Sequence, residues 1–94
     1  MYLHYEQVAS SAVVKTTSAL NPPPEATGVD AQAETEDIRY TMDGATNPTA
    51  ATGMLLKSGA APIYFLIEDL KRIRFIQSGT GGKLNLHYSG GRDI

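Results

Sequence analysis

The segment from Asp37 to Gly53, with the sequence DIRYTMDGATNPTAATG, constrains the fold of this chain more than any other stretch. Its first part alternates apolar with polar residues, which is the period of a half-buried strand. Asp43-Gly44 then predicts a tight turn, because glycine tolerates a positive φ and aspartate bonds to nearby backbone. A polar loop follows and ends at Gly53. The segment therefore predicts a strand, a structured turn and the start of a second strand.

Strand-like patterns recur on both sides of this segment, over residues 27–35, 54–57, 63–67, 73–76 and 84–88. The run Ile63–Ile67 is apolar on both faces and predicts a central strand or one covered on both sides. Residues 68–71 predict a single helical turn or a tight turn, in preference to a longer helix over residues 67–76. Six or seven short strands predict an all-β fold, a small antiparallel β-sandwich or barrel.

The first 25 residues are less regular. Tyr2–Tyr5 and Val13–Thr17 carry strand-forming residues, but serine and alanine dilute both patterns. Three consecutive prolines follow Asn21, and proline cannot donate a hydrogen bond to a central ladder. We therefore expect residues 1–25 to be an extended N-terminal arm or edge strand with a proline-rich break. Residues 26–88 would then form the β-sandwich domain and residues 89–94 a flexible tail.

Composition indicates a small single domain. The chain has 94 residues and no cysteine, so we expect no disulfide and no thiolate metal site. The first residues lack the basic start and apolar run of a signal peptide, and no stretch reaches the roughly 20 apolar residues of a membrane span. The net charge of −2 argues against a dedicated nucleic-acid-binding protein.

Charge is divided unevenly along the chain. Seven of the ten acidic residues lie within the first 44 residues, whereas six of the eight basic residues follow them. One interpretation is that oppositely charged strands pair within one fold. The other is that an acidic surface of one molecule meets a basic surface of a neighbour.

No residues form a recognisable catalytic or cofactor-binding motif. The glycine run at residues 79–82 precedes Lys83-Leu84 and a strand pattern, rather than the Lys-Ser or Lys-Thr and helix of a phosphate loop. His4 and His87 lack sequence neighbours that would complete a zinc site or a triad. The acidic cluster at residues 34–37 lacks the glycine of a calcium loop, and the loop after Asp43 has too few carboxylates. We expect no metal, no cofactor and no enzymatic activity.

Lys71, Arg72 and Arg74 form a basic run beside Phe75. Strand alternation places Arg72 and Arg74 on one face, opposite Ile73 and Phe75. This face is either a contact with an acidic protein surface or a solvent-exposed face paired with acids on a neighbouring strand. Nucleic acid is disfavoured, because no aromatic residues interleave with the basic ones on that face.

The segment IRYTMDGATNPTAATG is similar to a turn of the accessory β-sandwich domains found beside chitobiase and hexosaminidase catalytic domains. The matching residues are Tyr40, Thr41, Asp43, Gly44, Pro48 and Thr49, with Asn47 as an extra residue. From about Ala26 onward, the chain also resembles small proteins encoded among the structural genes of tailed bacteriophages. There the matching pieces are Ile38–Gly44, Pro48–Gly53, Met54–Leu56, Ile73–Ile76 and Leu84–Tyr88.

The phage resemblance implies a non-enzymatic virion structural protein, made in the host cytoplasm. We expect a capsid cement (decoration) protein that binds and stabilises the shell as a homo-oligomer, with a trimer favoured and the major capsid protein as partner. A tail or neck component is an alternative. The chitobiase-type resemblance implies a glycan-binding or spacer module, in which Tyr64 is the freest platform because alternation places Tyr40 and Tyr88 in the core. The candidate partner contacts are Tyr2, Tyr5, Asp43, Asn47, Thr49, Tyr64, Arg72 and Arg74.

Overall fold

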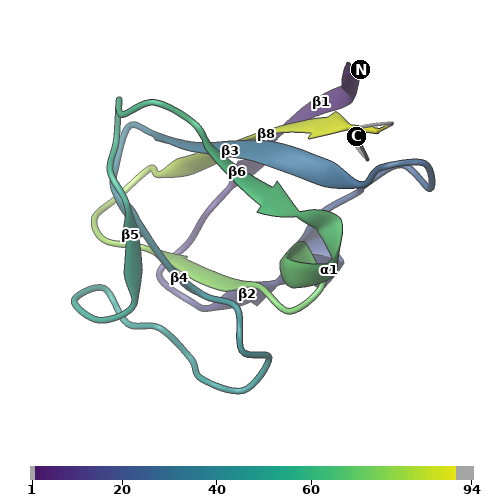
Figure 1. Cartoon of the computed structure of the whole chain (residues 1–94). Coiled ribbons are helices and arrows are strands. Elements are labelled where there is room, and N and C mark those ends of the chain that lie inside the picture. Colours follow the sequence, from purple (N-terminus) through teal and green to yellow (C-terminus); the bar gives the residue numbers. More distant parts are fainter. Residues whose placement is uncertain (1, 91–94) are drawn as a thin grey trace.

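The computed structural model describes residues 2–90 and shows two four-stranded antiparallel sheets that enclose one core (Figure 1). The strands are β1 (Tyr2–Ala9), β2 (Lys15–Thr16), β3 (Gly28–Glu34), β4 (Ile38–Thr41), β5 (Met54–Leu56), β6 (Ile63–Leu66), β7 (Arg74–Gln77) and β8 (Lys83–Ser89). A 3-10 turn, η1 (Thr17–Ala19), and a one-turn helix, α1 (Ile67–Leu70), complete the elements. The predicted all-β fold is confirmed. The described residues contain eight strands rather than six or seven, because the N-terminal segment contributes both β1 and β2.

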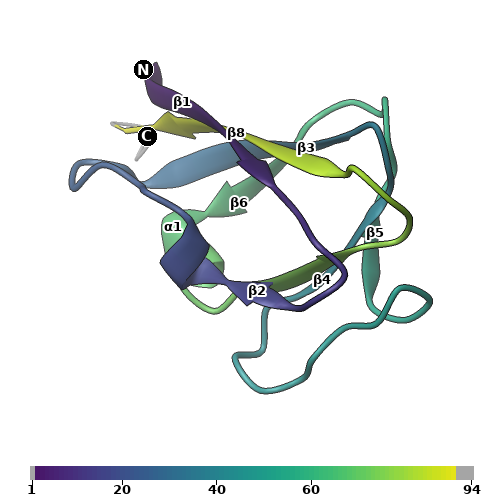
Figure 2. The same ribbon diagram turned by 180° about the vertical axis from the view of Figure 1, so that it is seen from behind.

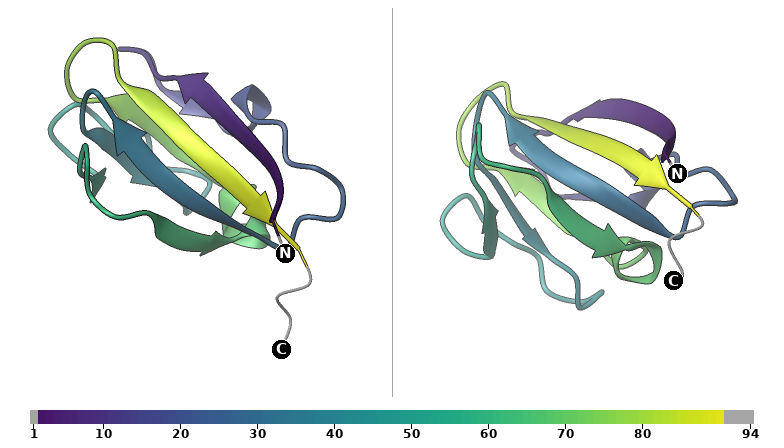
Figure 3. Two further views of the ribbon diagram at one scale, coloured as in Figure 1. Left: turned by 90° about the horizontal axis from the view of Figure 1, so that it is seen from above. Right: turned by 45° about the horizontal axis from the view of Figure 1, so that its top comes forward.

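Each sheet is built around a central antiparallel pair. We name the sheet with order β1-β8-β3-β6 sheet A, and the sheet with order β2-β7-β4-β5 sheet B. In sheet A, β3 and β8 are in register from Gly28–Ser89 to Glu34–Lys83. In sheet B, β4 pairs with β7 on one side and with β5 on the other. Figure 3 shows the four strands of sheet A side by side along the top of the molecule.

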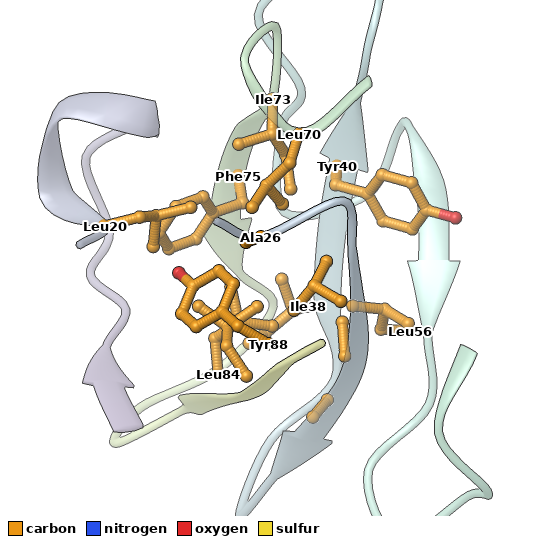
Figure 4. Packing of buried hydrophobic residues seen from close by; sticks show 14 residues of the cluster. Leu20, Ala26, Ile38, Tyr40, Leu56, Leu70, Ile73, Phe75, Leu84 and Tyr88 are labelled. Atoms are coloured by element: carbon orange, nitrogen blue, oxygen red, sulfur yellow. The ribbon is translucent and has the colours of Figure 1, made fainter. Parts of the chain in front are cut away.

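The core lies between the sheets and consists of the alternate side chains that face inward. Ile38 of β4 and Phe75 of β7 point from sheet B toward the space that Tyr88 of β8 enters from sheet A (Figure 4). Phe75 and Tyr88 are fully buried, and removing a buried aromatic ring of this size costs about 3–5 kcal/mol. The buried cluster comprises Leu20, Ala26, Val29, Ala31, Ala33, Ile38, Tyr40, Leu56, Leu70, Ile73, Phe75, Leu84, Leu86 and Tyr88. The predicted core positions of Tyr40 and Tyr88 are confirmed.

A buried hydroxyl connects this core to the N-terminal segment. Tyr88 donates to the Glu6 carboxylate of β1 over 2.5 Å, which satisfies a polar group that burial would otherwise leave unpaired. The same carboxylate accepts the backbone N–H of Asn21 at 2.8 Å. Burial, followed by the bond to Glu6, raises the pKa of Tyr88. Glu6 therefore joins β1, the start of the proline segment and the core.

Residues 2–9 form an edge strand of sheet A. β1 pairs with β8 from Tyr2–Ser89 to Ala9–Lys83, with a shift of register between Tyr2 and His4. Figure 2 shows the chain leaving β1, crossing to sheet B as β2 and passing through η1 before it returns to β3. At the other end, Ser89 is the last residue of β8, and residues 91–94 of the expected tail lie outside the described residues.

The prediction that Ile63–Ile67 forms a central strand is wrong. β6 ends at Leu66 and is an edge of sheet A, where it pairs with β3. Its inward side chain Phe65 packs on the core, with its ring centroid 5.4 Å from that of Tyr40. Leu66 points outward and is 56% exposed. The apolar character of both faces thus belongs to an edge strand with an apolar outer face. The predicted single helical turn after this strand is confirmed as α1.

Candidate functional site

The outer faces of the two sheets differ in what covers them. On sheet B, the loop that joins β4 to β5, residues 42–53, lies against the outer face (Figure 1). On sheet A, no segment within residues 2–90 crosses the outer face, as the view from above shows (Figure 3, left). The predicted contact residues are divided between these two faces.

Asp43 organises the start of the β4–β5 loop. Its carboxylate accepts the backbone N–H groups of Ala45 at 2.9 Å and Thr46 at 2.8 Å, and the Thr46 hydroxyl at 2.5 Å. These bonds, with the Thr46 hydroxyl contributing most, lower the pKa of Asp43 to about 2. Gly44 has a φ of 74°, which an L side chain rarely adopts. Asp43-Gly44 thus forms the tight turn that the sequence predicts.

Arg74 of β7 fixes this part of the loop to sheet B. Its guanidinium donates to the carbonyl oxygens of Gly44 and Ala45, both at 3.0 Å, and to Oδ1 of Asn47 at 2.7 Å. A planar guanidinium suits such a group of acceptors. Arg74 and Asn47 are therefore engaged with each other within the fold.

The far end of the loop is fixed in the same way. Arg39 of β4 donates to the carbonyl oxygen of Gly53 at 3.1 Å, and Pro48 is buried. Thr49 and Thr52 exchange backbone hydrogen bonds, and their hydroxyl oxygens lie 2.6 Å apart. The loop is consequently fixed over the part of the outer face of sheet B that β4 and β7 form.

The prediction that Arg72 and Arg74 share one strand face is wrong. β7 begins at Arg74, whereas Arg72 lies in the turn after α1. The Arg72 side chain is exposed, and its stem lies beside Gly44, whose carbonyl oxygen also accepts from Arg74. Arg74 bonds to carbonyl oxygens rather than to acids on a neighbouring strand. Among residues 2–90, the one ion pair joins Lys71 to Glu68 at 3.1 Å, so no ion pair links the acidic half to the basic half there.

The outer face of sheet A carries the polar side chains that alternate with the core residues. β3 and β8 are paired so that Asp30 lies opposite His87 and Gln32 opposite Asn85. Tyr5 of β1 lies on the other side of His87. Three strands that are distant in the sequence therefore bring aromatic, amide and carboxylate groups to one surface.

A hollow of about 320 Å³ opens on this face. Tyr2 stacks on His87 with the ring centroids 4.0 Å apart and the planes at 18°, and Tyr5 approaches the same imidazole edge-on at 6.1 Å. Tyr2 and Tyr5 are 54% and 53% exposed, which leaves much of each ring accessible. The lining residues are Tyr2, Tyr5, Asp30, Gln32, Pro62, Asn85, Leu86 and His87.

Most hydrogen-bond donors beside the hollow are already used by the fold. The Tyr5 hydroxyl donates to Oδ1 of Asn85 at 2.8 Å, and Nδ2 of Asn85 donates to Glu34 at 2.9 Å. The side-chain amide of Gln7 donates to Asn85 at 2.9 Å and to Glu34 at 3.3 Å. This network fixes the amide and tyrosine side chains in place.

Asp30 stands apart from that network. Its Oδ2 accepts the Tyr2 hydroxyl at 2.5 Å. Its neighbour on the same face, Gln32, donates its amide to the carbonyl oxygen of Ala60 at 3.0 Å. Asp30 is therefore the carboxylate that lines the hollow, where it accepts a hydrogen bond from a neutral hydroxyl group.

Tyr64 of β6 lies on the same outer face, beside the first residues of β3. Its ring passes directly over Gly28, and a Cβ at Gly28 would overlap the ring. Gly28 thus leaves room for the Tyr64 ring in its present position, and its φ is not positive. The structure brings Tyr64 to the same sheet face as Tyr2 and Tyr5, whereas Asp43, Asn47 and Arg74 lie together on sheet B.

A second hollow, of about 390 Å³, lies between the proline segment and α1. Its lining residues are Pro22, Pro23, Pro24, Ala26, Ile67, Glu68 and Lys71.

Within residues 2–90, no three His, Asp or Glu side chains are grouped as metal ligands. None of the helices in that part of the chain has the length and apolar character to cross a membrane.

Sequence reasoning missed Asp30, Asn85 and His87 as members of the candidate site. Each occupies an ordinary polar position of an alternating strand, so nothing in its own neighbourhood distinguishes it. The signal that would have found them is the pairing of β3 with β8, and these strands are separated by most of the chain.

Comparisons of the chain with protein-family models, with curated proteins and with solved structures found no match.

Proposed function

We propose that this chain is a non-enzymatic structural protein of a bacteriophage virion, a capsid cement protein that binds the shell through the outer face of sheet A. The observation that carries the binding role is the contrast between the two faces. Sheet B is covered by its own loop, whereas sheet A presents exposed tyrosines around a hollow. The virion assignment is supported by the resemblance carried by Ile38–Gly44, Pro48–Gly53 and Leu84–Tyr88.

Exposed aromatic rings suit a protein-binding surface. Tyrosine is enriched at protein interfaces, because it buries a large area and loses few rotatable bonds. Tyr2 and Tyr5 are held in position by Asp30 and Asn85 through their hydroxyl groups. Such fixed rings cost little further ordering when a partner binds. The proposed partner is the major capsid protein.

The edge strands support self-association of the chain. β6 has the sequence IYFL, without the charge or proline that usually protects an exposed edge. Met54 of β5 lies opposite the buried Tyr40, and Ile63 of β6 lies opposite the buried Ala31, so both face the inner side of their sheets. Their side chains are nevertheless 63% and 42% exposed. An edge that exposes inner-face side chains is suited to a second copy of the chain. A symmetric homo-oligomer, with a trimer favoured, would multiply weak contacts with the shell into lasting attachment.

The proposal is tested on particles. If the gene lies in a phage or prophage, virions purified on a density gradient should contain the chain in a fixed ratio to the major capsid protein, measured by quantitative mass spectrometry. Antibodies against the purified chain should label the outside of intact heads in electron micrographs. Virions that lack the chain although the gene is expressed would overturn the assignment. Labelling confined to the tail or neck would move the protein to that part of the virion.

A glycan-binding or spacer module is the second candidate, favoured by the stacked Tyr2 and His87 rings on an open sheet face. Sugar rings pack against exposed aromatic platforms, and the amides of Gln32 and Asn85 lie nearby. The test is a glycan array probed with the labelled chain. Binding to one class of sugar that Tyr2→Ala removes would favour this function, whereas an array without signal would dispose of it.

A further inference from the structure

We infer that the hollow on sheet A receives an arginine side chain of the protein that the chain binds. The inference rests on the proposed function only in taking the partner to be a protein. Its chemical basis lies in the charges, the hydrogen bonds and the rings of the hollow, which are independent of any virion.

The charge of the hollow favours a cation. Asp30 is the carboxylate among the lining residues, and neither lysine nor arginine lines the hollow. Within residues 2–90, no lysine or arginine forms an ion pair with Asp30. Lys83 lies on the same face, but it pairs opposite Glu34 at the other end of β3. A cationic side chain would therefore meet a carboxylate that no lysine or arginine of the described residues neutralises.

The hydrogen-bond inventory includes acceptors for a ligand that only donates. The donors of Tyr5, Gln7 and Asn85 are directed at acceptors within the network, and the Gln32 amide is directed at a backbone carbonyl. The Asp30 carboxylate keeps acceptor capacity toward the hollow, and His87 adds one ring N–H and one ring acceptor. A guanidinium has five donors and no acceptor.

The rings favour arginine over lysine. A planar guanidinium stacks on aromatic faces while its edge donates to a carboxylate, whereas an ammonium group is a compact point charge. Tyr2 and Tyr5 flank His87, and Tyr2 also donates to Asp30. The hollow thus places accessible ring surface and a carboxylate side by side.

The experiment is an NMR titration of the full chain labelled with ¹⁵N. The probe is the peptide acetyl-Gly-Arg-Gly-amide, and the matched control peptide carries citrulline, which has nearly the same shape without the charge. We expect the arginine peptide to shift the amides of residues 30–32 and 85–87 in a saturable manner, more weakly at high salt. The citrulline peptide should cause no saturable shift there.

Two variants locate the contact. Asp30→Asn should weaken arginine-peptide binding about fivefold, which is the upper range for a partly exposed charge pair. Asp69→Asn removes the same charge from exposed α1 and should leave binding unchanged. Tyr5→Leu provides a second variant that removes ring surface without touching Asp30. Each variant is first checked for a native-like spectrum outside the site.

Several results would overturn the inference. Equal binding of the arginine and citrulline peptides would remove the role of charge. Shifts confined to residues 42–53 or to the proline segment would place the contact elsewhere. Saturable shifts with cellobiose or chitobiose but not with the arginine peptide would assign the hollow to a saccharide, and no shift with any probe would leave it without a ligand function. Because no virion is used, failure here is distinguishable from failure of the proposed function.

Discussion

Replacing Arg74 with methionine should detach the β4–β5 loop from sheet B and lower the free energy of unfolding by about 2 kcal/mol. The magnitude follows from the three hydrogen bonds that the guanidinium donates to the loop, at 2.7–3.0 Å. A hydrogen bond to a charged group contributes about 1.5–3 kcal/mol when it is shielded from water. Arg74 is only partly buried, so water replaces part of each bond and the sum falls well below three full contributions.

Urea unfolding followed by far-ultraviolet circular dichroism measures this loss, because the chain has no tryptophan to report by fluorescence. For a domain of this size, the same change lowers Tm by about 10 °C. The matched control is Arg72→Met, which removes the same charge from an exposed side chain two positions away but keeps the Cβ and Cγ that lie beside Gly44, and it should cost no more than about 0.5 kcal/mol. Hydrogen exchange should accelerate in residues 42–53 of the Arg74 variant alone. Equal losses in the two variants would refute the reasoning.

Three further predictions concern the packing, the turn and the edge. Gly28→Ala should destabilise the fold by about 1 kcal/mol at most, because the added Cβ displaces the partly exposed Tyr64 ring, and Tyr64→Ala should recover most of that loss in thermal melts; additive effects would contradict the contact. Asp43 has its pKa lowered from 3.8 to about 2, so its stabilising contribution is complete above pH about 4 and is lost as the pH falls toward 2. Urea titrations should therefore show a smaller acid-induced loss for Asp43→Asn than for the parent chain, and equal losses would argue against a folded-state role for this carboxylate. Leu66→Lys places a charge on the exposed β6 edge and should lower the molar mass measured by light scattering toward that of the monomer. Thr80→Lys, on an exposed hairpin, should leave the mass unchanged. An unchanged mass for both variants would exclude the β6 edge as the self-association site.

Local patterns in the sequence predicted much of the fold. Alternation identified the strands that contain Ile38, Phe75 and Leu84, because their inward residues are apolar and their outward residues are polar apart from Ile76 of β7. Asp43-Gly44 predicted the turn, since both its side-chain capping and its positive φ are properties of two adjacent residues. These features depend on interactions within a few residues, and such interactions can be inferred from one sequence.

Features that depend on distant segments were not predictable in the same way. The sequence of β6 predicts a central strand because Tyr64 and Leu66 are apolar, but the outer face of an edge strand can also carry apolar residues. The basic run predicts that Arg74 belongs to a charged surface, yet its partners are carbonyl oxygens of a loop that lies some thirty residues earlier in the sequence. The hollow requires the register of β1, β8 and β3, which the sequence does not encode locally.

Hydrogen-exchange footprinting of the chain, free in solution and attached to purified heads, tests the central claim most directly. If the outer face of sheet A is the binding surface, exchange should slow on attachment in residues 2–9, 28–34 and 83–89, while residues 42–53 should exchange at the same rate in both states. Protection of the β4–β5 loop with no change in β8 would contradict the account, because the face that the fold already covers would then be the one that binds.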